Sequence, residues 1–137
     1  MRFKTGLKLA LLGVSLIGVA GAAPAVAGDV YVIAHLGVAL TAAELKDVYL
    51  GEKQFVGPIK LVPVDNAAVQ GDFLAKALNM EASRYGALWT KKGFRGALAA
   101  PAIKSGDTEV IGFVKNTPGA IGYVSAQSGG VKELFKY

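Results

Sequence analysis

The polar side chains best suited to bind a ligand lie around the start of one predicted helix. Asp65 and Asn66 directly follow the apolar run 59–64, and both are N-cap candidates for a helix over about residues 67–79. Gln70 lies one turn into that helix, where its amide faces either a cleft or plain solvent. Asp65 and Asn66 are therefore either simple helix caps or ligand groups, and one residue can be both.

Two further side chains are candidates for the same chemistry. His35, the only histidine, follows the first predicted strand, a place where α/β sheets often position ligand groups. The alternative is a solvated loop histidine. Arg95 ends the densest basic cluster, with Lys91 and Lys92, and its guanidinium is suited to bidentate binding of an anion. The alternative is a solvated helix end whose cations complement the helix dipole.

The sequence lacks the motifs of the common enzyme and metal classes. It contains no G-x-S-x-G, H-E-x-x-H, EF-hand, Walker A or G-x-G-x-x-G pattern, and without cysteine it has no thiol chemistry. Its carboxylates are scattered, although folding could bring two of them together. We therefore expect a binding protein rather than an enzyme, with no metal and no other cofactor.

Residues 1–27 have the three parts of a secretory signal. An apolar stretch over residues 9–23 follows three basic residues, and a small-x-small cleavage pattern ends at Ala27. We expect cleavage and export to the periplasm, leaving one domain over residues 28–137; the alternative is an uncleaved membrane anchor. The basic residues of this predicted signal are Arg2, Lys4 and Lys8.

The net charge of the predicted mature domain is small. The whole chain has 15 basic and 10 acidic residues, but three of the basic ones lie in the predicted signal, which leaves +2 for residues 28–137. No long basic stripe remains, so we expect no nucleic-acid partner.

The elements that must position the candidate residues alternate between strands and helices. This order predicts an α/β domain, a mixed sheet flanked by helices. Pro63 cannot donate to a ladder, so its strand is predicted at an edge or to end early. Residues 94–104 are predicted irregular. The predicted strands are 29–34, 59–64, 120–124 and 131–135; the predicted helices follow the capping box Thr41–Glu44, span 67–79 and 81–92, and follow the caps 105–107.

Several segments together resemble the phosphate-type periplasmic substrate-binding proteins of ABC transporters, and more closely the small single-domain exported proteins related to them. The most specific match is Thr117–Val124, TPGAIGYV, in which Pro118 suits the turn, Gly119 suits positive φ, and Gly122 allows a close neighbour. The order and spacing of other segments agree. The resemblance implies one lobe of a type 2 periplasmic-binding-protein-like fold. The other matching segments are 30–35, 40–45, 49–53, 61–65, Phe73, Trp89, 94–96 and Pro101.

The resemblance also implies a site and a function. In the family, a Ser-Gly-Thr-rich turn holds the oxyanion at a helix start; here the stretch is Asp65–Gly71, where backbone groups such as Ala67 N–H remain but the hydroxyls are absent. Asp65 would repel a dianion unless its carboxylate accepts a hydrogen bond from a protonated ligand. The first hypothesis is capture of a phosphate-like oxyanion for an ABC permease. The alternative is a ligand-free domain that binds an envelope sensor or another protein. One lobe cannot easily enclose a ligand, so a homodimer would supply the second surface.

Overall fold

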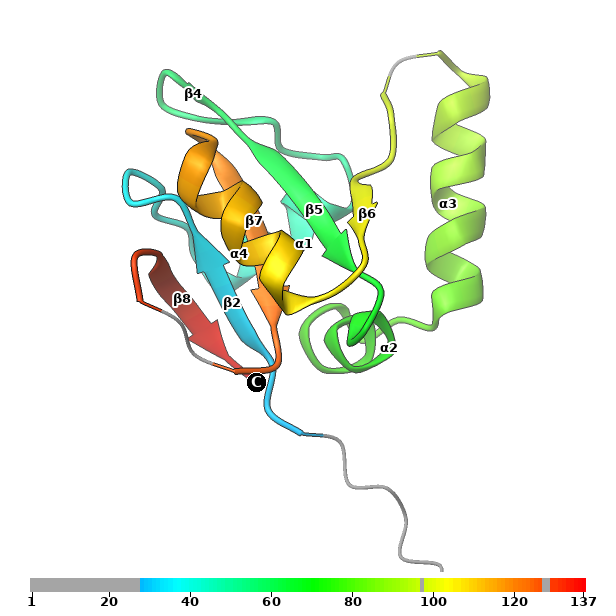
Figure 1. Ribbon diagram of the computed structural model, residues 1–137. Coiled ribbons are helices and arrows are strands. Elements are labelled where there is room, and N and C mark those ends of the chain that lie inside the picture. Colours follow the sequence, from blue (N-terminus) through cyan, green and yellow to red (C-terminus); the bar gives the residue numbers. More distant parts are fainter. Residues whose placement is uncertain (1–27, 97, 127–128) are drawn as a thin grey trace, which may run out of the picture.

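The computed structural model describes residues 28–96, 98–126 and 129–137, and the predicted signal lies outside the described residues. Five strands form one sheet in the order β6-β5-β7-β2-β8, and a separate hairpin joins β3 to β4 (Figure 1). The strands are β2 (Tyr31–Ala34), β3 (Phe55–Val56), β4 (Ile59–Lys60), β5 (Val62–Asn66), β6 (Ala102–Lys104), β7 (Ala120–Val124) and β8 (Lys132–Lys136). The helices are α1 (Ala42–Tyr49), α2 (Gln70–Phe73) with its π-helical continuation η3 (Leu74–Leu78), α3 (Ala82–Phe94) and α4 (Asp107–Asn116).

The sheet is mixed, as predicted. Strand β5 runs parallel to both β6 and β7, whereas β2 runs antiparallel to β7 and β8. The carboxyl ends of β5, β6 and β7 therefore meet at one edge, and the carboxyl end of β2 lies at the opposite edge. This direction of the strands decides which candidate residues can come together.

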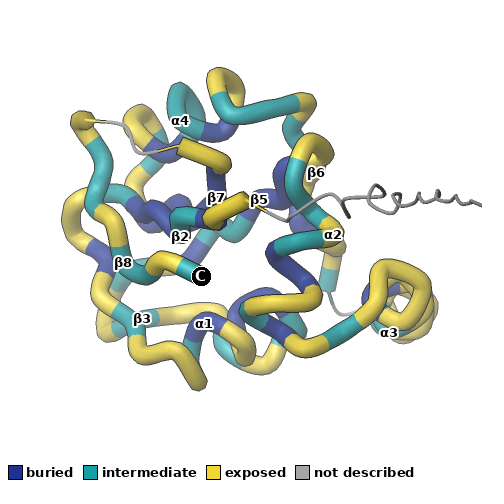
Figure 2. The backbone as a smooth tube through the Cα atoms, turned by 90° about the horizontal axis from the view of Figure 1, so that it is seen from below, coloured by how far each residue is buried: buried dark blue, intermediate teal, exposed yellow. Residues whose placement is uncertain are grey.

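Helices cover both faces of the sheet. Helix α4 packs on one face, where its Val110 and Val114 contact Ile33 and Val64, while α1 and α2 cover the other face (Figure 1). Helix α3 stands beyond β6 at the side of the sheet, and most of its surface is exposed (Figure 2). The core is therefore densest around β2 and β7 and thinnest between α3 and the sheet.

Strand β7 is the most deeply buried element. All five of its residues are buried, and β5 and β2 pair with it on either side. Gly119 precedes it with φ of +83°, and a Cβ there would collide with the Lys60 carbonyl oxygen. At Gly122 a Cβ would lie 2.5 Å from Val110 Cγ1, so the missing side chain is what lets α4 approach.

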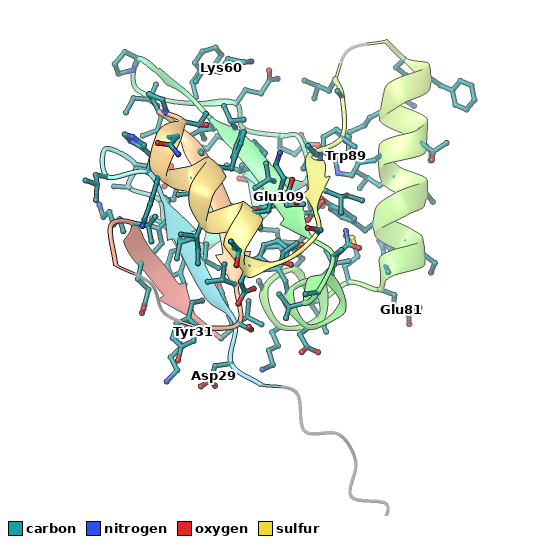
Figure 3. The ribbon with its side chains drawn as sticks, in the orientation of Figure 1. Asp29, Tyr31, Lys60, Glu81, Trp89 and Glu109 are labelled. Carbon is teal, nitrogen blue, oxygen red and sulfur yellow. The ribbon has the colours of Figure 1, made fainter. Side chains whose placement is uncertain are left out.

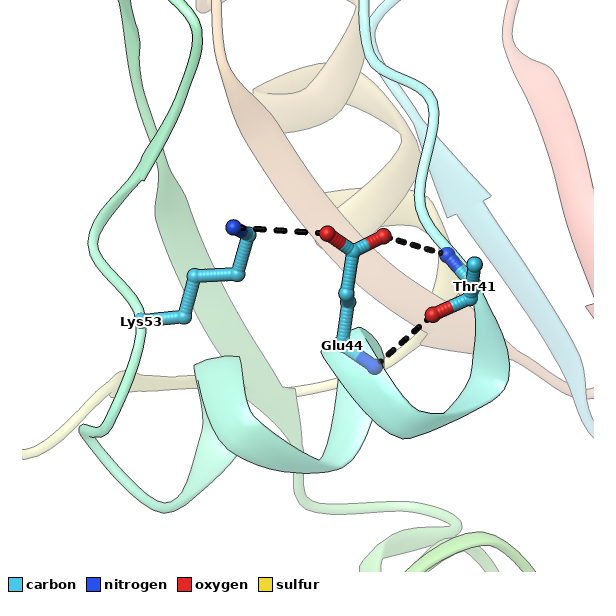
Figure 4. A network of polar contacts seen from close by, with 3 residues as sticks. All are labelled: Thr41, Glu44 and Lys53. Atoms are coloured by element: carbon cyan, nitrogen blue, oxygen red, sulfur yellow. Dashed lines mark hydrogen bonds and ion pairs between the residues drawn. The ribbon is translucent and has the colours of Figure 1, made fainter.

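The predicted capping box is confirmed at the start of α1. The Thr41 hydroxyl accepts from the Glu44 backbone N–H at 3.1 Å, and Glu44 Oε1 accepts from the Thr41 N–H at 2.9 Å (Figure 4). Lys53 approaches the other oxygen of Glu44 at 3.3 Å. These bonds hold the pKa of Glu44 below its usual value, the bond from the Thr41 backbone being the largest cause.

The prediction that the strand of Pro63 lies at an edge or ends early is wrong, because β6 and β7 flank β5 and the strand continues to Asn66. The Val62 N–H donates to the carbonyl of Gly119, the residue just before β7, so the backbone nitrogen of Pro63, the next residue, faces the β6 side. Pairing with β6 begins only at Val64. Proline is therefore tolerated where no neighbouring strand requires its N–H.

Three other boundaries differ from the prediction. The helix predicted over 67–79 begins only at Gln70, with Val69 as its N-cap, because the intervening residues form a turn. The predicted irregular segment contains β6, and the predicted strand 59–64 divides into β4 of a hairpin and β5. Short strands such as these carry too few residues to show a hydrophobic period. Among the described residues, no helix is long and apolar enough to cross a membrane.

Candidate functional site

Asp65 is a buried carboxylate at the carboxyl end of β5. It is 1% exposed, and it accepts hydrogen bonds from the Tyr123 hydroxyl at 2.7 Å and the Tyr85 hydroxyl at 2.9 Å. Burial raises the pKa of Asp65 above its usual value, although the bonds from Tyr123, Tyr85 and Gln70 oppose that shift. Desolvation and the nearby Asp65 charge also raise the pKa of both tyrosines, so both remain hydroxyl donors.

The Asp65 carboxylate lines an open cavity between α3 and the β5–β6 edge, which we name the Asp65 cleft. The cleft has a volume of about 400 Å³. Among the described residues that line it, none is a lysine or arginine, so its polar groups are one carboxylate and neutral side chains. Its lining is Asp65, Gln70, Ala82, Tyr85, Gly86, Trp89, Thr90, Ala100, Pro101 and Ile103.

Asn66 takes part in a structural network rather than lining the cleft. Its Nδ2 donates to Asp107 Oδ1 and to the Tyr123 carbonyl, both at 2.9 Å, and its Oδ1 accepts from the Ala68 N–H at 3.0 Å. Asp107 in turn accepts from the Ser125 hydroxyl at 2.6 Å. Asn66 thus joins the ends of β5 and β7 to the start of α4, and it caps a turn instead of a helix.

The backbone N–H groups of the predicted ligand loop already have partners. Ala67 N–H donates to the Lys104 carbonyl at 2.9 Å, and Ala68 N–H donates to Asn66 Oδ1. Val69 N–H donates to the Asn66 carbonyl at 3.2 Å. These three N–H groups, which include the Ala67 N–H that the family resemblance assigns to an oxyanion, therefore already have partners within the chain.

His35 and Arg95 lie away from the Asp65 cleft. His35 follows β2, whose carboxyl end is at the opposite edge of the sheet. The backbone N–H of His35 donates to the Ala120 carbonyl at the start of β7. Arg95 follows α3, ten residues beyond Tyr85 and thus about 15 Å along the helix axis. Arg95 lines a separate cavity of about 380 Å³ with Arg84 and Lys91, on the helix face opposite Trp89. Of the predicted side chains, the structure brings Asp65 and Gln70 together at this cleft.

The start of α4 at the same edge carries carboxylates of its own. Asp107 and Glu109 occupy its first turn. The Ser105 N–H and hydroxyl both donate to Glu109 at 2.8 Å, and these bonds hold the pKa of Glu109 below its usual value. The positive end of this helix dipole is therefore already neutralised. No cluster of three or more potential metal ligands occurs in the described part of the chain.

Tyr85 and Tyr123 are site residues that the sequence did not reveal. Tyr85 lies at the spacing of a buried helix stripe with Trp89, and Tyr123 lies within the apolar run of a predicted strand. A tyrosine in such a pattern carries a hydroxyl that needs a partner when buried, and this was the available signal. Only the fold shows that both hydroxyls converge on one carboxylate.

Comparison with known proteins identifies the fold. A structure from Clostridium perfringens, described as a phosphate ABC transporter substrate-binding protein with bound phosphate, matches with a TM-score of 0.57 at 18% identity. The match covers 78% of this chain and 45% of that chain. An ABC-type phosphate transport receptor from Vibrio cholerae matches with a TM-score of 0.50 at 14% identity, over 78% of this chain and 46% of that chain.

This chain has the fold of one half of these binding proteins. The resemblance found in the sequence is thus confirmed for the fold, which is a mixed sheet with helices on both faces. The chain spans less than half of the length of either neighbour. No protein-family model matches the chain, and no curated protein sequence is similar to it.

Proposed function

We propose that this domain is a solute-binding domain that captures a small, phosphate-like oxyanion in the Asp65 cleft without catalysing a reaction. The observation that carries the proposal is a buried carboxylate at the carboxyl end of a parallel strand, facing an open cleft. Crevices at such strand ends are the usual ligand sites of open α/β sheets. The fold neighbour with bound phosphate supports the same class of solute.

Asp65 would select for a proton on the solute. A carboxylate accepts hydrogen bonds and repels a bare anion, so an oxyanion with an acidic O–H fits it better than one without. Gln70 offers an amide donor for the other oxygens of the oxyanion. Phosphate carries such a proton near neutral pH and sulfate does not, so we expect phosphate to bind and sulfate to be rejected.

The cellular setting is part of the proposal. A signal over residues 1–27 would export the domain to the periplasm, where it would deliver solute to an ABC-type permease or a sensor.

Because a typical site buries about 70–90% of a small ligand, a second surface is needed over the Asp65 cleft. A second copy related by a two-fold axis would supply it. Native mass spectrometry with and without phosphate would test this association.

Calorimetry and thermal unfolding with phosphate and with sulfate would test which oxyanion the domain binds. We expect phosphate to bind at least about tenfold more tightly than sulfate. Asp65→Asn should remove that discrimination, because the amide neither repels sulfate nor requires a proton. Asp47→Asn, on the exposed side of α1, is the matched control and should leave it unchanged. If neither anion binds at millimolar concentration, the proposal fails.

A further inference from the structure

A second cavity, the apolar chamber, lies between the middle of β5 and the segment that links α3 to β6. It has a volume of about 330 Å³ and shares Trp89, Ala100 and Pro101 with the Asp65 cleft. Trp89 reaches from α3 toward the sheet, so it separates the two cavities (Figure 3). Most of the other lining side chains are apolar: Val48, Leu61, Val62, Pro63, Val64, Leu98, Ala99, Ala102 and Phe113.

The late start of β6 and the proline in β5 explain why an apolar chamber is stable here. Strand β6 pairs with β5 only from Val64 onward, which leaves the first residues of β5 uncovered on that side. An uncovered edge normally exposes N–H donors that demand partners. Here Pro63 has no N–H, and the Leu61 N–H is bonded to the Gln54 carbonyl at 2.9 Å. The edge therefore presents no free donor to the chamber at either residue.

The charged groups of the chamber are all positive. Lys53 and Lys60 line it, and among the described lining residues there is no carboxylate. Lys53 has Glu44 as a partner at 3.3 Å. The Lys60 amine lies 5.3 Å from the centre of the Phe55 ring, and within the described part of the chain it forms no ion pair. An apolar cavity lined by a lysine that has no ion-pair partner among the described residues is complementary to an amphiphilic anion.

We propose that the apolar chamber binds the hydrocarbon chain of a small amphiphilic anion, such as a medium-chain carboxylate, with its head group at Lys60. The volume lies at the lower end of the range for small-molecule sites. The Asp65 carboxylate on the other side of Trp89 would repel a carboxylate head group, which carries no proton, so the two cavities would distinguish anions with an acidic O–H from anions without one. This proposal does not depend on the solute of the Asp65 cleft.

The protein contains a reporter for this test, because Trp89 is its only tryptophan and lines the chamber. Fluorescence titration of the purified protein would compare octanoate with 1-octanol and octyltrimethylammonium, with thermal unfolding as a second readout. We expect octanoate to bind most tightly. Across butyrate, hexanoate and octanoate, the affinity should rise by up to about fourfold per methylene, which corresponds to about 0.8 kcal/mol.

A pair of charge reversals tests the head-group assignment. Lys60→Glu should weaken octanoate by about tenfold and favour octyltrimethylammonium. Lys91→Glu, on the outer face of α3, is the matched control and should change neither. Equal affinity for octanoate and octanol, no dependence on chain length, or equal effects of the two reversals would overturn the proposal. So would the absence of both a fluorescence change and a thermal shift.

Discussion

Strand β7 and the α3–β6 side of the molecule are held together in opposite ways. Strand β7 is buried at every residue and paired on both sides. Helix α3 is mostly exposed (Figure 2), and among the described residues three polar contacts tie it to the body of the fold. These are Tyr85 to Asp65, the Trp89 indole N–H to the Tyr49 carbonyl at 3.1 Å, and Lys92 to Glu52 at 3.0 Å.

The difference separates the scaffold from the site. The most specific sequence segment, TPGAIGYV, builds β7 and its turn, yet its buried core positions leave little room for a ligand. Both cavities lie instead beside α3, where packing is thinner. The two regions meet at Asp65, which takes one hydroxyl from β7 through Tyr123 and one from α3 through Tyr85.

The largest loss of stability should come from Gly119→Ala. The residue has φ of +83°, and an added Cβ would collide with the Lys60 backbone, which is not free to move away. We expect a loss of about 3 kcal/mol in the free energy of unfolding, measured by urea denaturation. Gly112→Ala within α4 is the control: nothing lies within 4 Å of its added Cβ, so it should stabilise by up to about 1 kcal/mol. If both substitutions changed the free energy of unfolding equally, the special requirement for glycine at position 119 would be contradicted.

A smaller loss should follow Tyr123→Phe. The substitution leaves a buried carboxylate oxygen without its donor but keeps the ring stacked on Phe73 at 3.8 Å, so we expect a loss of about 2 kcal/mol. Tyr85→Phe should cost about half as much, because water can enter the Asp65 cleft and replace its hydroxyl. Urea denaturation of both variants compares the two regions directly. A greater loss for Tyr85→Phe would show that α3 is the more firmly held element.

The pH dependence of stability should report Asp65. Its folded pKa is raised above 3.8, so the stability linked to its protonated form is full below that value and is lost as pH rises through the folded pKa. Asp65→Asn cannot ionise and escapes this loss. The free energy of unfolding of the variant, relative to the unsubstituted protein, should therefore increase as pH rises from about 4 toward neutrality. A difference that is independent of pH would contradict the raised pKa.

The smallest effect should come from Lys92→Gln. Lys92 and Glu52 form an ion pair in which the carboxylate side chain is 62% exposed, so solvent screens it. We expect a change below about 0.5 kcal/mol in urea denaturation at moderate salt. A loss as large as that of Tyr85→Phe would mean that this pair, rather than the Asp65 contact, holds α3.

Elements with a strong internal pattern were predictable from the sequence. The buried strand over β2, the Thr41–Glu44 capping box, α3 and the TPGAIGYV segment each follow from local residue types, and the structure contains them all. Strand β6 was not predicted because three residues are too few to show a hydrophobic alternation. The position of the Pro63 strand in the sheet was predicted wrongly because the order of strands does not depend on local sequence.

The site was predictable only in part, for a related reason. Asp65 was recognisable from its position after a strand, but its partners come from 20 and 58 residues away. His35 was placed by the rule for strand ends, and the reversed direction of β2 carries it to the other edge. Arg95 was a candidate because of its charge. Its position along α3 places it on a different face of the helix from the residues that line the Asp65 cleft.

The two borders of the sheet limit how copies of this protein can join. Strand β8, with the sequence KELFK, carries lysine or glutamate at three of five positions, and β6 at the opposite border has only three residues. A charged border and a very short one both discourage a neighbouring chain from extending the sheet. The fold thus disfavours fibre-like growth through its sheet borders, and it leaves the helices and loops as the better surfaces for an assembly that stops at a closed pair.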